Sequence, residues 1–391
     1  MSAAARITAR HVWTPAGLRS HCAVTIDADQ RVVSVDEASP GESLLNGILM
    51  PGFVNANGRL EQSHHRRPLG PAGAGRAAWR SRLAAATSTA DHFTAERGAR
   101  AARASGTAFF IDVSPTGGTA EAMAVARLRG TMLVECSGWS IEQWRPALAV
   151  ARARARASTA HVQCRPTAHA PSACAPDLLR AALVRGVAPV TIHCDEDAGD
   201  ASGLADRIGS WAELPPRLAG GAAGDDWLGH LGTTASGVAL LHALELLAPH
   251  LGLVHLTAAG DADLDRIAES GCTAVLCPRS NLHITGRLPD VPGMVRRGIP
   301  LALGTDSCAS VRGLDLLADA AVLRAAFPRL PVELWVRALT EGGASLLSQR
   351  SDAGRIVPGA RPDLLLVEVA DDGAPLERLL DGTRWPRRWL T

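Results

Sequence analysis

The chain has 391 residues, a formal net charge of +1, 47% apolar residues and 20% charged residues. Its length suits one large barrel with a small accessory unit, or two ordinary domains. The balanced charge gives no support for nucleic acid or an anionic membrane as a partner. The sequence holds neither lysine nor tyrosine, which excludes a Schiff-base lysine, a carbamylated lysine ligand and a tyrosine acid.

Eight cysteines are spread along the chain without a Cys-x-x-Cys pair, and several lie inside apolar, strand-like runs. This pattern is typical of buried, reduced thiols in a cytoplasmic protein. The N-terminal stretch lacks the continuous apolar core of a signal peptide, and no apolar stretch is long enough to span a bilayer. We therefore expect a cytoplasmic protein.

Both ends of the chain have the pattern of short strands. Residues 7–13 and 22–37 consist of β-branched runs broken by a polar turn, and residues 354–369 hold two strand-like runs around a Pro-Gly turn. We expect the two ends, residues 1–48 together with 350–391, to meet in one small sheet domain.

The long centre, residues 49–349, alternates apolar strand-like runs with Ala-, Leu- and Arg-rich helical stretches. Near-continuous apolar strands that alternate with helices predict a parallel sheet covered on both faces, and eight such units fit a (β/α)₈ barrel. The eight runs are residues 47–56, 107–114, 131–138, 160–169, 188–194, 251–256, 272–278 and 299–306.

Polar residues stand where several of these runs end, and the carboxyl ends of barrel strands meet at one mouth. Three histidines and two carboxylates at matching strand ends therefore predict one site. These residues are His169 after the fourth run, His193 and Glu196 after the fifth, His255 after the sixth and Asp306 after the eighth.

Several short motifs at these positions resemble the amidohydrolase superfamily, and its deaminase branch in particular. They are PGFVNA (51–56), His193-x-x-Glu196, VHL (254–256), CPRSN (277–281) and LGTDS (303–307). Residues 60–66 and 169–179 are similar to aminodeoxyfutalosine deaminases. The resemblance covers nearly the whole chain and implies a TIM barrel beside a small β-sandwich built from both termini.

The resemblance implies metal-assisted hydrolysis, in which zinc or iron lowers the pKa of a bound water. Relatives hold the ion with a His-x-His on strand 1, a His on strand 5 and an Asp on strand 8. Carried onto this chain, His193 and Asp306 become metal ligands. Glu196 becomes the proton shuttle, while His255 and Asp306 orient the water. The implied substrate-binding residues are Glu61, His64 and His169.

The strand-1 metal motif is degenerate, because Asn57 and Arg59 stand where relatives have two histidines. A neutral amide oxygen is a poor zinc ligand, and a guanidinium has no lone pair to give. We therefore expect zinc or iron to bind weakly or not at all. We hypothesise that Arg59 replaces the ion electrostatically, pairing bidentately with Asp306 or bridging to Glu196. Replacement ligands from His64 and His65 are the alternative.

Three functions stay open. The first is hydrolysis of a non-peptide C–N bond in a nucleoside-like amine, favoured by the retained Glu196, His255 and Asp306. The second is a catalytically inactive homologue that binds a ligand or partner, favoured by Asn57 and Arg59. The third is a metal-free enzyme that uses Glu196 and His255 as acid and base. The resemblance implies a purine-nucleoside-like small molecule and a homodimer as partners.

Overall fold

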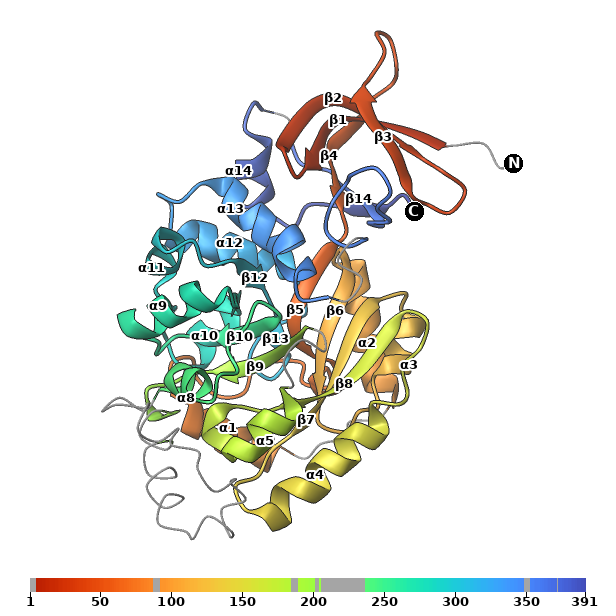
Figure 1. Ribbon diagram of the computed structural model, residues 1–391. Helices are drawn as coiled ribbons and strands as arrows, with labels where there is room; N and C mark the ends of the chain where they lie inside the picture. Colours follow the sequence, from red (N-terminus) through yellow and green to blue (C-terminus); the bar gives the residue numbers. More distant parts are fainter. Residues whose placement is uncertain are drawn as a thin grey trace.

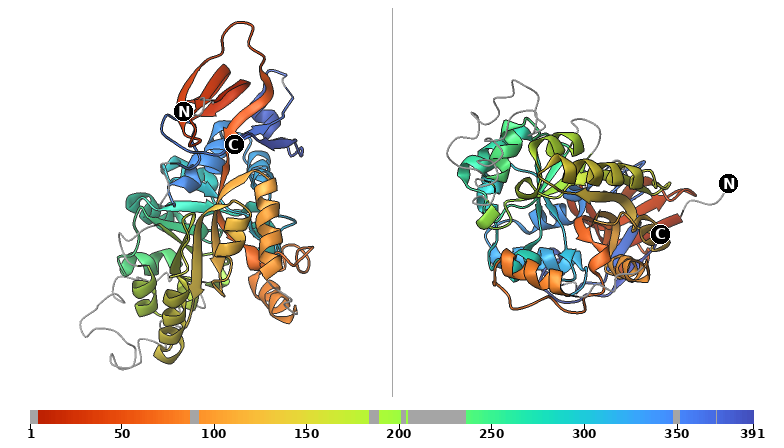
Figure 2. Two further views of the ribbon diagram at one scale, coloured as in Figure 1. Left: turned by 90° about the vertical axis from the view of Figure 1, so that its right-hand side faces the viewer. Right: turned by 90° about the horizontal axis from the view of Figure 1, so that it is seen from below.

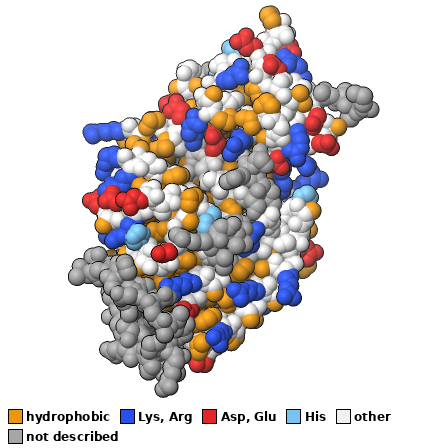
Figure 3. Space-filling model, viewed as in Figure 1, with side chains coloured by type: hydrophobic (Ala, Val, Ile, Leu, Met, Phe, Trp, Pro, Cys, Tyr) orange, Lys and Arg blue, Asp and Glu red, His pale blue; other side chains and the backbone are white. Residues whose placement is uncertain are grey.

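The structure is a computed structural model that describes residues 5–86, 92–183, 189–200, 204, 236–347, 352–370 and 372–391. A sheet that contains both chain ends lies at one end of the molecule, and a larger unit of strands and helices lies below it (Figure 1; Figure 2, left). Positive and negative side chains are interspersed over the face shown in Figure 3, in keeping with the balanced net charge.

The terminal sheet has six strands in the order β15-β14-β4-β1-β2-β3. Because β4 pairs antiparallel with β14, the two chain ends share this sheet, as predicted. The structure places one six-stranded sheet here, so the sandwich and the domain limits stay predictions. The strands are β1 (Ala5–Thr14), β2 (Gly17–Ile26), β3 (Val32–Glu37), β4 (Leu45–Pro51), β14 (Leu364–Val367) and β15 (Arg387–Trp389).

Strand β4 joins this sheet to the rest of the molecule. Its side chains alternate between two cores, as expected of a strand covered on both faces. Ile48 and Met50 belong to the main core, while Leu49 packs with Val12 and Leu364 in a smaller cluster. All of these side chains are fully or almost fully buried. The small sheet is therefore fixed firmly against the larger unit.

The central strands form two parallel sheets, in the orders β13-β5-β6-β7-β8 and β12-β11-β10-β9. Every residue of β5, β6, β9 and β10 is buried, which accounts for their apolar runs. Each of the eight predicted runs contains a strand. The strands are β5 (Phe53–Arg59), β6 (Thr107–Ser114), β7 (Arg129–Cys136), β8 (Val162–Ala168), β9 (Val190–Cys194), β10 (Leu251–His255), β11 (Thr273–Leu276), β12 (Leu301–Leu303) and β13 (Asp306–Ser307).

Two short links join the edges of these sheets. Strands β12 and β13 are consecutive in the chain, and between them the Thr305 N–H donates to Asn55 Oδ1 of β5 (3.2 Å). At the other edge, the His193 N–H donates to the His169 carbonyl (3.2 Å) and the Thr167 hydroxyl to the Thr191 carbonyl (2.9 Å). Because β8 and β9 share no continuous ladder among the described residues, a closed barrel is not established by the strand pairing.

Helices lie on the outside of the strands (Figure 2, right). Helix α4 begins with a capping box of Ser140 and Gln143, and α9 ends at Gly271, whose φ of 69° suits glycine. None of the described helices is both long and apolar enough to cross a membrane. The helices are α1 (Arg76–Ala85), α2 (His92–Ala104), α3 (Ala120–Val125), α4 (Ile141–Arg154), α5 (Pro176–Ala182), α8 (Gly237–Ala243), α9 (Asp261–Ser270), α10 (Pro278–Ile284), α11 (Val291–Arg296), α12 (Leu316–Ala326), α13 (Val332–Arg337) and α14 (Pro375–Leu379).

Three shorter turns complete the helical elements: the 3₁₀ turns η1 (Leu60–Gln62) and η2 (Pro171–Ala173), and the π-helical turn η3 (Ala338–Gly342). All eight cysteines are buried and none forms a disulfide. Their burial confirms the prediction made from the apolar runs that surround them.

A buried carboxyl group, Asp112 of β6, fixes the turn that follows β5. It accepts hydrogen bonds from the Leu60 N–H (2.8 Å) and from the Thr119 hydroxyl (2.5 Å). Burial raises the pKa of Asp112 to about 7, and these two hydrogen bonds oppose the rise. The turn carrying Leu60 therefore depends on a carboxyl group that takes up a proton in the folded protein.

We predict that Asp112 makes the protein lose stability as the pH rises from about 4 to about 7. In this window the folded Asp112 holds a proton that the unfolded carboxyl has released, so folding weakens by at most ~1.4 kcal/mol per pH unit. Asp112→Asn keeps the oxygen that faces Leu60 and removes the titration. Urea unfolding at several pH values should show that the free energy of unfolding falls less with rising pH in the variant than in the wild type. An equal fall in both proteins would contradict the raised pKa of Asp112.

Candidate active site

Polar side chains from seven chain segments line one cavity of about 230 Å³ at the carboxyl ends of the parallel strands. The structure thus brings together six residues that the sequence singled out, and it adds one, Glu135 of β7. Those that line the cavity are Arg59, Glu135, His169, His193, Glu196, His255 and Asp306.

The Arg59 guanidinium lies at the centre of this group. Its Nη1 donates to Glu135 Oε2 (3.1 Å) and its Nη2 to Glu135 Oε1 (2.8 Å), which makes a bidentate ion pair. Nη2 also lies 3.3 Å from His193 Nε2, while Nε lies 3.9 Å from Asp306 Oδ1. The guanidinium therefore stands between the two metal ligands that the family resemblance leaves.

The bidentate partner is Glu135, and neither carboxylate that we expected to fill this role does so. Oδ2 of Asp306 already accepts hydrogen bonds from the Ser280 hydroxyl (2.6 Å) and the Ser310 hydroxyl (3.3 Å). Glu196 is paired with a different cation, Arg76 of α1, at 3.6 Å. Our hypothesis that Arg59 replaces the ion electrostatically stays a prediction, and its bidentate partner is corrected to Glu135.

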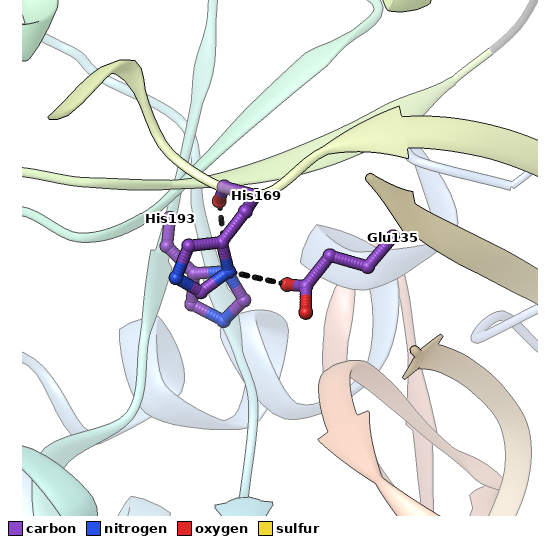
Figure 4. Close-up of side chains that lie close together, drawn as sticks. All are labelled: Glu135, His169 and His193. Atoms are coloured by element: carbon purple, nitrogen blue, oxygen red, sulfur yellow. Dashed lines mark hydrogen bonds and ion pairs between the residues drawn. The ribbon is translucent and has the colours of Figure 1, made fainter. Parts of the chain in front are cut away.

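Glu135 also binds a histidine, as Figure 4 shows. His169 Nδ1 lies 2.6 Å from Glu135 Oε1, the oxygen that also accepts from Arg59 Nη2. Burial acts to raise the pKa of Glu135, but the Arg59 cation and His169 hold that pKa well below its usual range. Glu135 is therefore an ionised carboxylate that fixes both the guanidinium and the imidazole.

His193 is a neutral imidazole with one defined tautomer. Its Nδ1 lies 3.2 Å from the His169 carbonyl, to which it donates (Figure 4), so the lone pair is on Nε2, which lies 3.3 Å from Arg59 Nη2. Burial and the Arg59 cation hold the pKa of His193 well below its usual range. The atom with which His193 would bind an ion is thus occupied by a guanidinium N–H.

His255 and Glu196 form a second buried pair at the mouth. His255 Nδ1 donates to Asn281 Oδ1 (3.1 Å), which leaves Nε2 facing Glu196 Oε1 at 3.9 Å. Arg76 holds Glu196 from the other side and also pairs with Asp200. Among the described residues, Arg59 makes neither a hydrogen bond nor an ion pair with His255 or Glu196.

The strand ends around the cavity are strained. Asp195, His255, Leu256 and Asp306 all have left-handed φ angles, between 47° and 80°, that favour glycine. Such conformations persist at functional sites, where the surrounding structure compensates for their cost of about 1–3 kcal/mol each. The strain supports a functional role for this mouth.

The two residues of β5 that replace metal-binding histidines, Asn57 and Arg59, differ in how well their surroundings accommodate them. Asn57 is fully buried, its Oδ1 has no hydrogen-bond partner among the described residues, and its Nδ2 lies 3.7 Å from Cys277 Sγ. Asn57 does not line the cavity, and Arg59 occupies the space between His193 and Asp306. The four positions that hold an ion in the implied family site therefore do not fit a divalent cation here.

A different set of donors lies close enough together to hold an ion. Ligand atoms of Glu135, His169 and His193 all lie within 4.8 Å of one another. Three such donors would suffice for zinc. Arg59 already binds Glu135 through both oxygens and contacts His193 Nε2, so this set becomes available only when the guanidinium leaves.

The remaining predicted substrate residues lie outside the cavity lining. Glu61 accepts hydrogen bonds from the hydroxyls of Ser114 and Thr116 (2.6 Å for Thr116), and His64 Nδ1 lies 3.1 Å from the Glu61 carbonyl. The His64 ring lies against His65, with centroids 3.9 Å apart. A role for Glu61 and His64 in substrate binding stays a prediction.

Sequence reasoning missed two contributors to the cavity. Glu135 lies inside an otherwise apolar run, and a carboxylate in a buried strand needs a cation, which was the available signal. The second contributor is helix α1, which lies beside the mouth and supplies Arg76, Trp79, Arg80 and Leu83. None of its residues is buried, and its local pattern gives no sign of this position.

Comparison with known protein families matches residues 48–384 to the "Amidohydrolase family". The chain belongs to the amidohydrolase family. The match spans both central sheets and, in the terminal sheet, β14 and part of β4, so the resemblance inferred from short motifs is confirmed.

Curated relatives of this amidohydrolase are named as deaminases. It is 30% identical over 210 residues to 5-methylthioadenosine/S-adenosylhomocysteine deaminase of Syntrophobacter fumaroxidans, covering 51% of this chain and 42% of the relative. It is 36% identical over 114 residues to aminodeoxyfutalosine deaminase of Deinococcus radiodurans, covering 29% and 27%. The matched part is thus less than half the length of these relatives.

Two solved structures share the fold over nearly the whole amidohydrolase chain. An adenosine deaminase from Xanthomonas campestris with bound zinc has a TM-score of 0.76 at 22% identity, covering 96% of this chain and 88% of the other. Helicobacter pylori aminofutalosine deaminase in complex with methylthio-coformycin has a TM-score of 0.72 at 17% identity, covering 96% and 95%. At these identities the likeness concerns the fold.

We predict that Glu135→Gln destabilises the folded protein by about 3–5 kcal/mol, because it leaves the Arg59 cation buried without its carboxylate. Urea unfolding at neutral pH measures the loss. The double variant Arg59→Met with Glu135→Gln removes both charges and should recover part of it. Wild-type stability in Glu135→Gln would contradict the buried ion pair.

Proposed function

We propose that the chain is a metal-independent member of the amidohydrolase family, which binds a nucleoside-like amine in the cavity and does not hydrolyse it with a metal-activated water. We also propose that the two parallel sheets make one (β/α)₈ barrel and that the protein is cytoplasmic. The observation that carries the proposal is the Arg59 guanidinium between His193 and Asp306.

Electrostatic repulsion by Arg59 and the stability of the Arg59–Glu135 ion pair both oppose the binding of a metal ion. A divalent cation beside the fixed charge of Arg59 would be repelled, and the repulsion is strong where water is scarce. Moving Arg59 away would break a buried bidentate pair with Glu135, which costs about 3–5 kcal/mol. When zinc is bound in a site of this kind, it supplies hydroxide near neutral pH, and a guanidinium cannot do so.

The remaining side chains suit the binding of a polar, ring-containing ligand. Trp79 lines the cavity, and its indole N–H donates to the Ala309 carbonyl (3.1 Å), which fixes the ring. His169 and Glu196 add polar groups to the same cavity. The relatives named as deaminases of methylthioadenosine and aminodeoxyfutalosine, and the H. pylori complex with methylthio-coformycin, support a nucleoside-like ligand.

A metal-free acid/base enzyme is the second candidate. The buried approach of His255 Nε2 to Glu196 Oε1, at 3.9 Å, favours it, because such a pair could move a proton between ligand and protein. Deaminase activity that survives a chelator and is lost in Glu196→Gln and in His255→Ala would replace our proposal with this one.

We predict that the wild-type protein, purified from zinc-supplemented cells, carries far less than one zinc or iron per chain by mass spectrometry. Arg59→Ala frees Glu135, His169 and His193, so this variant should gain zinc and melt at a higher temperature with zinc than without it. Arg59→Ala combined with His169→Ala, the matched control, should gain little. Near-stoichiometric metal in the wild type would overturn the proposal.

We predict that 5-methylthioadenosine raises the melting temperature of the wild type without being converted to its inosine analogue. In the double variant Asn57→His with Arg59→His, the family ligands are restored, so metal binding and deamination should appear together. Chromatography of the nucleosides measures turnover. A metal-loaded double variant that neither binds nor converts the nucleoside would argue against a nucleoside-like ligand.

A further inference from the structure

A second cavity, of about 360 Å³, lies at the opposite end of the parallel strands, beside the terminal sheet. Strand β7 connects the two sites, because Arg129 at its first residue lines this cavity and Glu135 near its end lines the candidate active site. At about 3.3 Å per residue the two residues are about 20 Å apart. The second cavity is therefore separate from the first.

This cavity has an excess of positive charge. Four arginines line it, and Asp363 is the one carboxylate side chain among its described lining residues. Arg103 donates to Asp363 Oδ2 (2.8 Å) and Arg129 to Asp363 Oδ1 (2.7 Å). A single side-chain carboxylate is thus shared by two of the four guanidinium groups.

Aromatic rings hold the guanidinium groups of Arg103 and Arg129 in place. The Arg103 guanidinium lies 3.5 Å from the centroid of Trp389, and that of Arg129 lies 4.1 Å from the centroid of Phe109. Arg129 also donates to the Arg361 carbonyl (2.7 Å). The floor of the cavity is therefore a preformed pair of guanidinium groups.

The other two cations, Arg127 and Arg361, are exposed at the cavity. Within the described part of the chain, neither side chain makes a hydrogen bond or an ion pair. Thr391 also lines the cavity, but its hydroxyl accepts from the Leu364 N–H (2.8 Å), and no ion pair joins it to these arginines among the described residues.

Repulsion among these cations acts on the buried pair. Burial lowers the pKa of Arg103, and Arg127 lowers it further against the attraction of Asp363. Burial likewise lowers the pKa of Arg129, with Asp363 opposing and Arg361 adding to the effect. Asp352, which attracts Arg129 more weakly than Asp363 does, is itself paired with Arg31 at 3.0 Å.

The backbone at Arg127 is left-handed. Arg127 follows the C-cap of α3 with a φ of 58°, a conformation that favours glycine. The turn is closed by hydrogen bonds from the Arg127 N–H to the Ala124 carbonyl (3.0 Å) and from the Leu128 N–H to the Met123 carbonyl (2.9 Å). An arginine stands where glycine would be easier to accommodate.

We propose that this cavity is a binding site for a small anion that bears phosphate groups, such as a diphosphate, held by Arg127 and Arg361 above Arg103 and Arg129. One guanidinium group can bind two phosphate oxygens at once. Several guanidinium groups that line one cavity therefore suit a ligand with more than one phosphate. The volume of about 360 Å³ exceeds what a single phosphate ion fills. A separate site of this kind does not depend on the function proposed for the first cavity.

Isothermal titration calorimetry of the full chain with inorganic pyrophosphate and with adenosine diphosphate, at constant ionic strength, tests the site. We expect one anion per chain. Arg127→Gly suits the left-handed backbone and so preserves the fold, and Arg361→Gln changes an exposed side chain. Each should weaken binding about tenfold or more, because a charge-assisted contact to phosphate is lost. Arg287→Gln, an exposed arginine outside the cavity, is the matched control.

Comparable affinity for both anions identifies the phosphate groups as the ligand, and tighter binding of the nucleotide identifies a nucleoside diphosphate. Both results support the site, provided that Arg127→Gly and Arg361→Gln weaken the binding and Arg287→Gln does not. Absence of binding heat for either anion, or affinity that is unchanged in Arg127→Gly and in Arg361→Gln, would overturn the proposal.

Discussion

The candidate active site depends on one buried ion pair, between Arg59 and Glu135. A guanidinium is costly to bury alone, and Glu135 offsets that cost through two short hydrogen bonds. The same carboxylate binds His169, while burial and the cation it holds keep the pKa of His193 well below its usual range, with Nε2 toward the arginine. Removing either partner of the pair would therefore change the surroundings of both histidines.

Under the proposed function, this ion pair takes the place of a metal's charge without its chemistry. Arg59 brings one fixed positive charge close to Asp306 and His193, and against the effect of burial it helps to hold the pKa of Glu135 well below its usual range. A guanidinium accepts no lone pair, so it cannot bind a water and lower its pKa as zinc does. The proposed function thus keeps the electrostatic part of the site and lacks the part that generates a nucleophile.

Sequence patterns predicted the strands and most of the cavity, because buried strands are apolar and barrel residues at strand ends converge. Glu135 was missed because the prediction considered only the residues at the end of each run, and Glu135 lies inside its run. The position of α1 was not predictable from its own residues. It is set by distant hydrogen bonds, from the Leu69 N–H to the Ala309 carbonyl (2.8 Å) and from the Gly73 N–H to the His283 carbonyl (2.8 Å). The pairing of β8 with β9, on which a closed barrel would depend, is likewise not specified by local patterns.

The contrast between Asn57 and Arg59 of β5 bears on whether the site has lost its function. Asn57 leaves a buried oxygen without a partner among the described residues, as an uncompensated substitution would. Arg59 makes a bidentate ion pair with Glu135, and the strained φ angles of His255 and Asp306 are found beside it. Such strain costs about 1–3 kcal/mol per residue, and a mouth without a ligand would gain stability by relaxing. The retention of costly geometry around a paired arginine therefore favours a cavity that still binds a ligand over one that has lost its role.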